Sequence, residues 1–137
     1  MSPWKKRREN LAEFTGERVV PGKVDPDLWN EHRSRYLFAA RLCRRKRVLD
    51  VGCGTGYGTA EIARVAASVI GLDVAADGLD YARAHFRSPN MSWVGAQAGA
   101  LPFPEKGFDS VIAFEIVEHL TEWQPLFDEA ARVLSDS

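Results

Sequence analysis

Two kinds of hydrophobic pattern alternate along the chain. Short apolar runs are typical of buried strands, and they occur at residues 48–51, 68–73, 91–95 and 108–115. Longer segments place apolar residues three or four positions apart, which is typical of helices with one buried face. These predicted helices span residues 26–43, 57–67, 76–87 and 121–134. Strands that alternate with helices predict a parallel sheet covered by helices.

The predicted helices and loops have recognisable ends. The apolar face of the first helix comprises Leu28, Trp29, His32, Tyr36, Ala39, Ala40 and Cys43. Asp77 is the predicted cap of the helix that begins at Ala76, and Thr121 with Gln124 resembles a capping box. A loop is predicted over 96–107, with the breakers Pro102, Pro104 and Gly107.

The whole chain is predicted to form one domain with an arm. Residues 1–25 are interrupted by Gly16, Pro21 and Gly22, which predicts an irregular N-terminal arm. Residues 26–137 form the predicted α/β domain, a Rossmann-like three-layer fold with a parallel sheet. In such folds ligands bind outside the carboxyl ends of the strands, where the strand order reverses.

Composition narrows the class of protein. The chain has 137 residues, 45% of them hydrophobic, and a net charge of −1, which suits one domain with a core. No apolar run approaches the roughly 20 residues of a membrane span, and no signal peptide is recognisable, so a cytoplasmic protein is expected. Cys43 and Cys53 lack the spacing of a metal site, so no bound metal and two ordinary buried thiols are expected.

Charge is unevenly spread along the chain. Residues 1–47 hold 13 Lys/Arg against 6 Asp/Glu, a net of +7, with clusters at 5–8 and 44–47. Such clusters can form a patch for nucleic acid or another anionic surface, or they can be solvated. The second cluster has no interleaved aromatic residues and the overall pI is about 6.3. The solvated interpretation is therefore favoured, and a nucleic-acid partner is not expected.

The segment VLDVGCGTGYGTA, residues 48–60, follows the first strand with four glycines. Glycine permits positive φ and lets a ligand approach the backbone, and the following helix start favours an anionic group. The dinucleotide fingerprint G-x-G-x-x-G does not match, which argues against a nicotinamide-dependent oxidoreductase. The spacing G-x-G-x-G after Asp50 suits a ligand with an amino acid end, whose ammonium group Asp50 can balance.

Further polar residues follow the other strands. Asp73 ends the second strand, where its carboxylate can accept hydrogen bonds from two ribose hydroxyls, or can cap the next helix instead. Gln97 can present an amide to an adenine edge. Glu115, Glu118 and His119 follow the fourth strand, where a functional role and a purely structural one stay equally open.

These motifs together resemble class I S-adenosylmethionine-dependent methyltransferases of the methyltransferase-11/UbiE-like group. The resemblance rests on VLDVGCGTGYGT, VIGLDVA, AGALPFPEKGFDSVIAFEIVEHL and LFDEAARVL, and covers about residues 47–134. An arm with GERVVPG and EHRSRY is similar to one branch of that group. The resemblance implies S-adenosylmethionine as cofactor and S-adenosylhomocysteine as product.

The family pattern also implies a set of cofactor-binding residues. Gly52, Gly54 and Gly56 would line the methionine moiety, with Asp50 beneath it. Asp73 would hold the ribose, and Val74 belongs to the same set. The adenine would be framed by Ala96, Gln97 and Ala98, and the sulfonium bordered by Glu115 and Ile116. No catalytic base is identified, and His119 and Glu118 are weak candidates.

Two features depart from the family. Gln97 stands where the family usually carries an acid, which replaces a charged acceptor for the adenine amino group by a neutral one. The family core has seven strands, whereas only four are expected here, in the order 3-2-1-4. The fourth strand would then be an exposed apolar edge, which predicts a truncated chain or pairing with another copy.

Two functions follow as expectations. The first is methyl transfer from S-adenosylmethionine to an unidentified, small-molecule acceptor. The alternative is a truncated module that binds S-adenosylmethionine or S-adenosylhomocysteine without turnover, completed by or paired with another chain.

Overall fold

The structure, a computed structural model, describes residues 25–114, 116 and 120–136, so the predicted arm lies almost wholly outside the described residues. Helices and strands alternate along the chain as predicted. Their bounds are α2 Pro26–Leu42, β1 Arg47–Val51, α3 Tyr57–Ala63, β2 Ser68–Asp73, α4 Ala76–His85, β3 Met91–Gly95, β4 Ser110–Ile112 and α5 Gln124–Val133.

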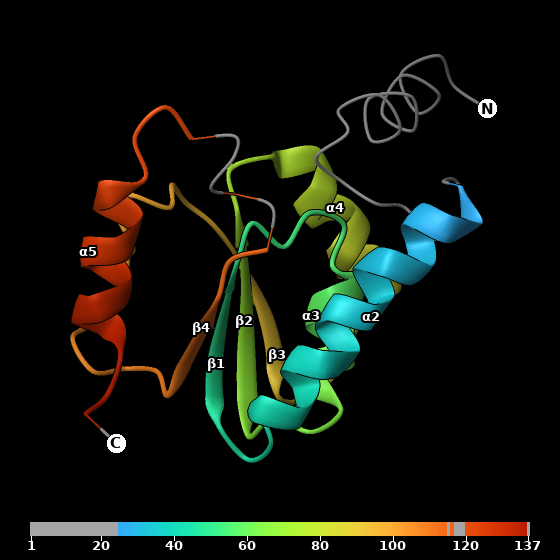
Figure 1. Cartoon of the computed structure of the whole chain (residues 1–137), viewed down its shortest axis with the longest axis horizontal. Coiled ribbons are helices and arrows are strands. Elements are labelled where there is room, and N and C mark those ends of the chain that lie inside the picture. Colours follow the sequence, from blue (N-terminus) through green and yellow to red (C-terminus); the bar gives the residue numbers. More distant parts are fainter. Residues whose placement is uncertain (1–24, 115, 117–119, 137) are drawn as a thin grey trace.

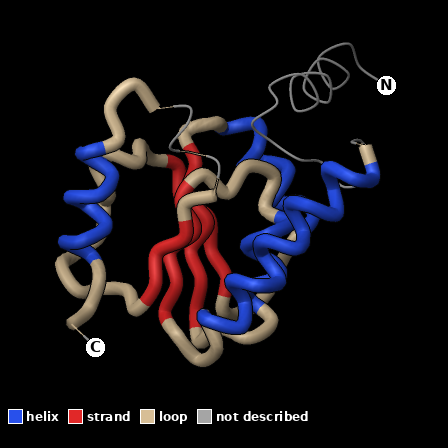
Figure 2. Tube along the Cα trace, viewed as in Figure 1, coloured by secondary structure: helices blue, strands red, loops and turns tan. Residues whose placement is uncertain are grey.

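The strands form one parallel sheet in the order β3-β2-β1-β4, which confirms the predicted topology. Figures 1 and 2 show α2, α3 and α4 together on one face of the sheet and α5 on the other. The result is the three-layer α/β arrangement expected from the hydrophobic pattern.

Two apolar clusters fill the spaces between these layers. On the α2–α3 side the cluster includes Tyr36, Val48, Ile62 and Val69, and on the α5 side it includes Leu49, Leu72, Leu126 and Val133. Strand β1 contributes to both, because its successive side chains point to opposite faces. Val48, Leu49 and Val51 are completely buried, which makes β1 the centre of the fold.

Helix α2 follows its prediction closely. The Asp25 side chain accepts a 2.8 Å hydrogen bond from the backbone N–H of Asp27, and Pro26 occupies the first turn. The predicted inner face is buried at His32, Tyr36, Ala39 and Ala40. The two exceptions lie in the first turn, where 42% of Leu28 remains exposed and Trp29 is only partly buried.

Helices α3 and α4 end earlier than their patterns predict. After Ala63 the backbone makes tighter turns, and the N–H of Ala67 then donates to Lys46, which leads the chain into β2. Phe86 has extended backbone angles and ends α4 at His85. The apolar periodicity continues past both ends, so it does not record where the backbone leaves the helix.

Both predicted caps are wrong. Ala75 precedes α4 without a side-chain cap, and the backbone N–H of Ala75 donates to Asp73 rather than to Asp77. Helix α5 begins at Gln124, later than Thr121, because Pro125 favours the first helical turn. The Gln124 amide donates to Asp128 in the next turn and forms no capping box.

Strand β4 has three residues instead of the predicted eight. Phe108 pairs with Leu134 in an isolated parallel bridge, so the start of the predicted strand contacts the end of the described chain instead of β1. Asp109 forms an ion pair with Arg47 and accepts from Ser135, and the hydrogen bonds from Arg47 hold the pKa of this carboxyl well below its usual range. Strand β4 still lies at one edge of the sheet, and its pairing with another copy stays a prediction.

Other expectations concern cysteines, membranes and metals. Cys43 and Cys53 are both buried and unbridged, as the prediction of two ordinary thiols requires. Among residues 25–114, 116 and 120–136, no helix has the length and hydropathy needed to cross a bilayer. Within the same residues no group of three His, Cys, Asp or Glu side chains is placed to hold a metal ion.

Candidate functional site

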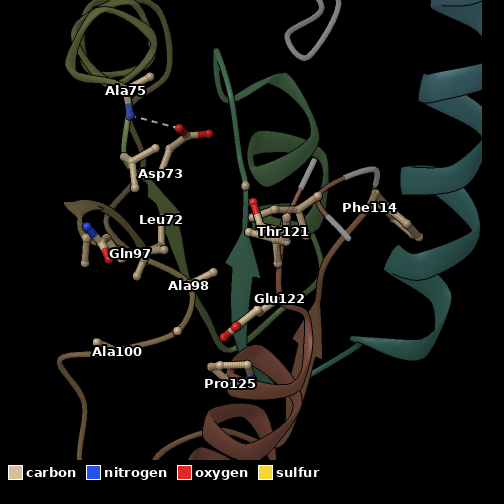
Figure 3. A pocket seen from close by; sticks show the side chains of 16 residues that line it. Leu72, Asp73, Ala75, Gln97, Ala98, Ala100, Phe114, Thr121, Glu122 and Pro125 are labelled. Atoms are coloured by element: carbon tan, nitrogen blue, oxygen red, sulfur yellow. Dashed lines mark hydrogen bonds between the residues drawn. The ribbon is translucent and has the colours of Figure 1, made fainter. Parts of the chain in front are cut away.

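A cavity of about 700 Å³ opens at the carboxyl ends of the strands. All four strands contribute to its wall, through Gly52 after β1, Asp73 at the end of β2, Ala96 after β3 and Phe114 after β4. Figure 3 shows that Gln97, Ala98 and Ala100 form one side, facing Thr121, Glu122 and Pro125. Because β1 is flanked by β2 and β4, the cavity lies where the strand order reverses, as such folds require.

Gly52, the first glycine of the loop, lines the cavity. Gly52 has a φ of +77°, and its N–H donates to the Leu72 carbonyl at 2.7 Å. A Cβ at this position would lie 3.1 Å from the Ile116 side chain, which also lines the cavity. Glycine is therefore required here both by backbone conformation and by the space beside the cavity.

Gly54 does not line the cavity itself but donates a hydrogen bond to Asp73, which does. It has a φ of +59°, and its N–H donates to Asp73 Oδ2 at 2.9 Å. The second carboxylate oxygen, Oδ1, accepts from the N–H of Ala75 at 2.9 Å. Asp73 thus holds the glycine loop and the start of α4 together while its side chain lines the cavity. Each carboxylate oxygen has a second lone pair, so both remain able to accept from a ligand.

The last two glycines are explained by packing within the protein. Gly56 has a φ of +93°, and a Cβ there would lie 2.6 Å from the Trp93 ring and 2.7 Å from the Ala82 methyl. A Cβ at Gly58 would lie 2.3 Å from the Tyr36 ring. Neither glycine lines the cavity, so Gly52 alone of the three predicted loop glycines does so.

Asp50 lies beneath the loop and is completely buried. It accepts hydrogen bonds from Thr59 Oγ1 at 2.7 Å and from the Tyr36 hydroxyl at 3.2 Å. Burial raises the pKa of this carboxyl to about 7, although both hydrogen bonds oppose the shift. Asp50 does not line the cavity. Its partners tie α2 and α3 to β1, so it supports the site from below.

The remaining predicted residues divide into two groups. Val74, Ala96, Gln97, Ala98 and Ile116 all line the cavity, and Val74 is 69% exposed. Glu115, Glu118 and His119 lie outside the described residues. The role of His119 or Glu118 as a catalytic base therefore stays a prediction.

Sequence reasoning missed other wall residues, which are Leu72, Ala75, Gly99, Ala100, Phe114, Leu120, Thr121, Glu122 and Pro125. The first five neighbour predicted positions at strand ends, so their place in the sequence is a usable signal. The last four come from residues 120–125, which lead into the first turn of α5, and beyond Leu120 this segment carries no family motif.

Helix α5 holds one wall of the cavity in place. The Arg132 guanidinium donates to the carbonyls of Phe103 at 2.8 Å and Leu101 at 3.0 Å, and it also pairs with Glu129. Glu129 in turn accepts from the N–H of Leu101 at 3.0 Å. These contacts secure the loop that continues from Gln97, Ala98 and Ala100. The sheet and cavity together define a Rossmann-like α/β domain with a cavity at its switch point.

The chain belongs to the methyltransferase domain family, whose model matches residues 48–137. It is 37% identical to a probable S-adenosylmethionine-dependent methyltransferase of Mycolicibacterium smegmatis, over 88% of this chain and 47% of the relative. A similarly named Mycobacterium tuberculosis protein, Rv3030, is 36% identical over 90% of this chain and 45% of its own length. The chain therefore spans about half the length of these curated relatives.

Solved structures agree with this assignment. An S-adenosylmethionine-dependent methyltransferase of Mesorhizobium loti superposes with a TM-score of 0.63 and 25% identity, covering 71% of this chain and 47% of that one. A methyltransferase of Aquifex aeolicus has a TM-score of 0.69 over 95% of this chain and 66% of that one. At 19% identity, the second likeness shows the fold alone. The resemblance found in the sequence motifs is confirmed.

Proposed function

We propose that the cavity binds S-adenosylmethionine and that this chain takes part in methyl transfer to a small-molecule acceptor. One observation carries the proposal: the Gly52 backbone and the Asp73 carboxylate meet on one wall, at the switch point of a methyltransferase-family sheet. The names of the mycobacterial relatives support the choice of cofactor.

The residues present fit this cofactor. A cavity of about 700 Å³ lies within the roughly 300–1,000 Å³ usual for small-molecule sites. Gly52 presents its backbone to the cavity, and Asp73 keeps lone pairs for two ribose hydroxyls. Ala96, Gln97 and Ala98 line the cavity with two methyl groups and one amide, which suits the apolar face and polar edge of an adenine.

The structure changes the proposed roles of three residues. Gly52 and Ile116 are assigned to the methionine end, and Glu115 stays assigned there from the family pattern. Gly54 is assigned to the positioning of Asp73, to which its N–H donates. Gly56 is assigned to the packing of the loop against Trp93. Asp50 is assigned to the support of the loop instead of to direct contact with the ammonium group.

The chemistry then depends on position more than on acid–base groups. Bound S-adenosylmethionine supplies a methyl group carried on a sulfonium and leaves as S-adenosylhomocysteine. Phe114, Ile116 and Leu120 line the cavity with apolar side chains, which can orient the bound methyl group and its acceptor. Orientation alone can supply effective molarities of about 10⁵–10⁸ M, so a chain without an identified base can still promote transfer.

The acceptor is proposed only by class. Other relatives are named as a fatty-acid O-methyltransferase of Mycolicibacterium smegmatis and a demethylmenaquinone methyltransferase of Tropheryma whipplei, each aligned over 65% of this chain. Fatty acids and quinols are therefore the first acceptors to assay. The alternative is a cofactor-binding module without turnover, completed by another chain at the β4 edge.

Cofactor binding is tested by isothermal titration with S-adenosylmethionine. Asp73→Ala should weaken binding at least tenfold, which corresponds to the loss of one charge-assisted hydrogen bond of roughly 1.5 kcal/mol or more. Asp80→Ala, an exposed carboxylate on α4 away from the cavity, is the matched control. Urea unfolding of each variant separates lost binding from lost folding, since Asp73 also accepts from Gly54. Unchanged affinity in Asp73→Ala would show that the ribose lies elsewhere.

Turnover is tested separately by S-adenosylhomocysteine formation with each acceptor. Formation of the product supports the methyltransferase, whereas binding without product supports the module. Absence of binding heat at high protein concentration would refute both.

A further inference from the structure

The outward face of α2 carries an unusual mixture of side chains in its C-terminal half. Leu37, Phe38 and Leu42 are 41%, 64% and 59% exposed. Cationic side chains surround them on the same helix and in the turn that follows, and all are exposed: Arg33, Arg41, Arg44, Arg45 and Lys46. These eight residues are called the α2 outer patch below.

The charge of this region is not balanced locally. Between His32 and Leu49 the chain contains no Asp or Glu. Arg35 pairs with Glu31, and Arg47 pairs with Asp109. Within the described part of the chain, the five cations of the α2 outer patch form no salt bridge. The patch therefore presents a concentrated positive charge to the surroundings.

Packing of the domain does not use the apolar members of the patch. The inner face of α2, with His32, Tyr36, Ala39 and Ala40, already covers α3 and the sheet. Figure 1 shows α2 as the outermost helix of its layer. Single exposed apolar residues are normal on a protein surface. Three large ones within two turns, interleaved with cations, are typical of a helix that lies at a membrane interface.

We propose that the α2 outer patch docks this protein on an anionic phospholipid surface. Leu37, Phe38 and Leu42 enter the boundary between headgroups and acyl chains, and the cations pair with lipid phosphates. A second copy meeting the same patch would bring two sets of unpaired cations together. Single-stranded nucleic acid is bound by aromatic stacking, which two leucines do not provide. Lipid is therefore the occupant that matches both the charge and the apolar side chains.

The proposed docking does not depend on the cofactor site. The cations at 44–46 precede β1 and so lie at the amino ends of the strands, whereas the cavity lies at their carboxyl ends. A membrane that contacts the patch leaves the cavity open. Variants of the patch are thus expected to leave the cavity unchanged, and the outcome of the vesicle experiment does not depend on which ligand the cavity binds.

The test is co-sedimentation of the full chain with vesicles of equal parts phosphatidylcholine and phosphatidylglycerol, and with phosphatidylcholine alone. The wild type should pellet with the anionic vesicles only, and less so as salt is raised. The triple variant Arg41→Gln, Arg44→Gln, Lys46→Gln should weaken partitioning about 100-fold, at roughly fivefold per cation. The double variant Phe38→Ser, Leu42→Ser should weaken it at least tenfold, from the loss of two buried apolar side chains.

Matched controls make the result specific to the patch. Arg64→Gln, Arg83→Gln, Arg87→Gln removes the same charge from α4 and from positions just after α3 and α4, and Phe127→Ser removes a ring that is 51% exposed on α5. Both controls should pellet far more than the patch variants. Equal losses in patch and control triples would reduce the effect to net charge and overturn the proposal. So would a wild type that stays in the supernatant, or one that binds duplex DNA with no dependence on Phe38 and Leu42.

Discussion

The buried carboxyl of Asp50 offers a direct test of how the loop is supported. Asp50 is completely buried and bonded to Thr59 and Tyr36. The substitution Asp50→Asn removes the titrating group and keeps its size. The amide oxygen can accept from one hydroxyl, and the amide nitrogen can donate to the other. The variant therefore tests the ionisation of Asp50 separately from its size and its hydrogen bonds.

The sign of the pH effect follows from the raised pKa. The pKa of Asp50 is about 7 in the folded protein, against 3.8 for a solvent-exposed Asp carboxyl in the unfolded chain. Between pH 8 and pH 5 the folded protein takes up a proton at Asp50 and the unfolded chain does not. The free energy of unfolding therefore rises as pH falls, by about 2.5 kcal/mol from this one group. That contribution is lost as pH rises through 7, the reverse of a carboxylate in an ion pair.

Urea unfolding followed by tryptophan fluorescence measures this contribution. The wild type and Asp50→Asn are compared at pH 8 and pH 5, so that every other titrating group contributes equally to both. The gain in stability on acidification should be larger in the wild type by about 2.5 kcal/mol. Parallel pH profiles for the two proteins would refute the reasoning, since they would mean that Asp50 stays ionised in the folded state.

Two further predictions concern packing around the cavity. Gly58→Ala places a methyl group against the buried Tyr36 ring and should destabilise the fold by roughly 1–3 kcal/mol, while Gly95→Ala, which makes only ordinary contacts, should change stability by less than about 0.5 kcal/mol in urea unfolding. If the two substitutions changed the free energy of unfolding equally, the Tyr36 ring would be able to move away from the added methyl group, and the reasoning would be wrong. Arg132→Met should lower the urea midpoint and speed hydrogen exchange at the Leu101 amide, and unchanged exchange there would mean that α5 does not hold the loop.

Much of the fold was predictable because local signals agree with tertiary structure. Strands 68–73 and 91–95 have their predicted bounds, since each is a short run rich in β-forming residues that pairs along its whole length with a neighbouring strand. The prediction of 108–115 as one strand is wrong at its start, because Phe108 pairs with Leu134, which lies far along the chain. A hydrophobic run shows that residues are buried, but not which partner supplies the hydrogen bonds.

The site was predictable at the strand ends and less so elsewhere. Asp73, Ala96 and Gln97 line the cavity because parallel strands deliver their carboxyl ends to one edge. The wall from Thr121 to Pro125 lies beyond the family motif that ends at Leu120, so no pattern in the sequence marks it as part of a site. The glycine loop carried a motif, yet that motif does not separate residues that face the cavity from residues that face the protein.

Tyr36 explains why the loop needs both glycine and an acid. Its ring occupies the space that a Cβ at Gly58 would fill, and its hydroxyl donates to Asp50 beneath the loop. The same ring packs edge-on against Phe114, 5.0 Å away between centroids, and Phe114 lines the cavity. Helix α2 contributes no residue to the cavity wall, but it sets the position of Phe114 and of the loop through this one side chain. Part of the motif after β1 therefore specifies the packing of α2 against the loop, and only Gly52 among its glycines lines the cavity.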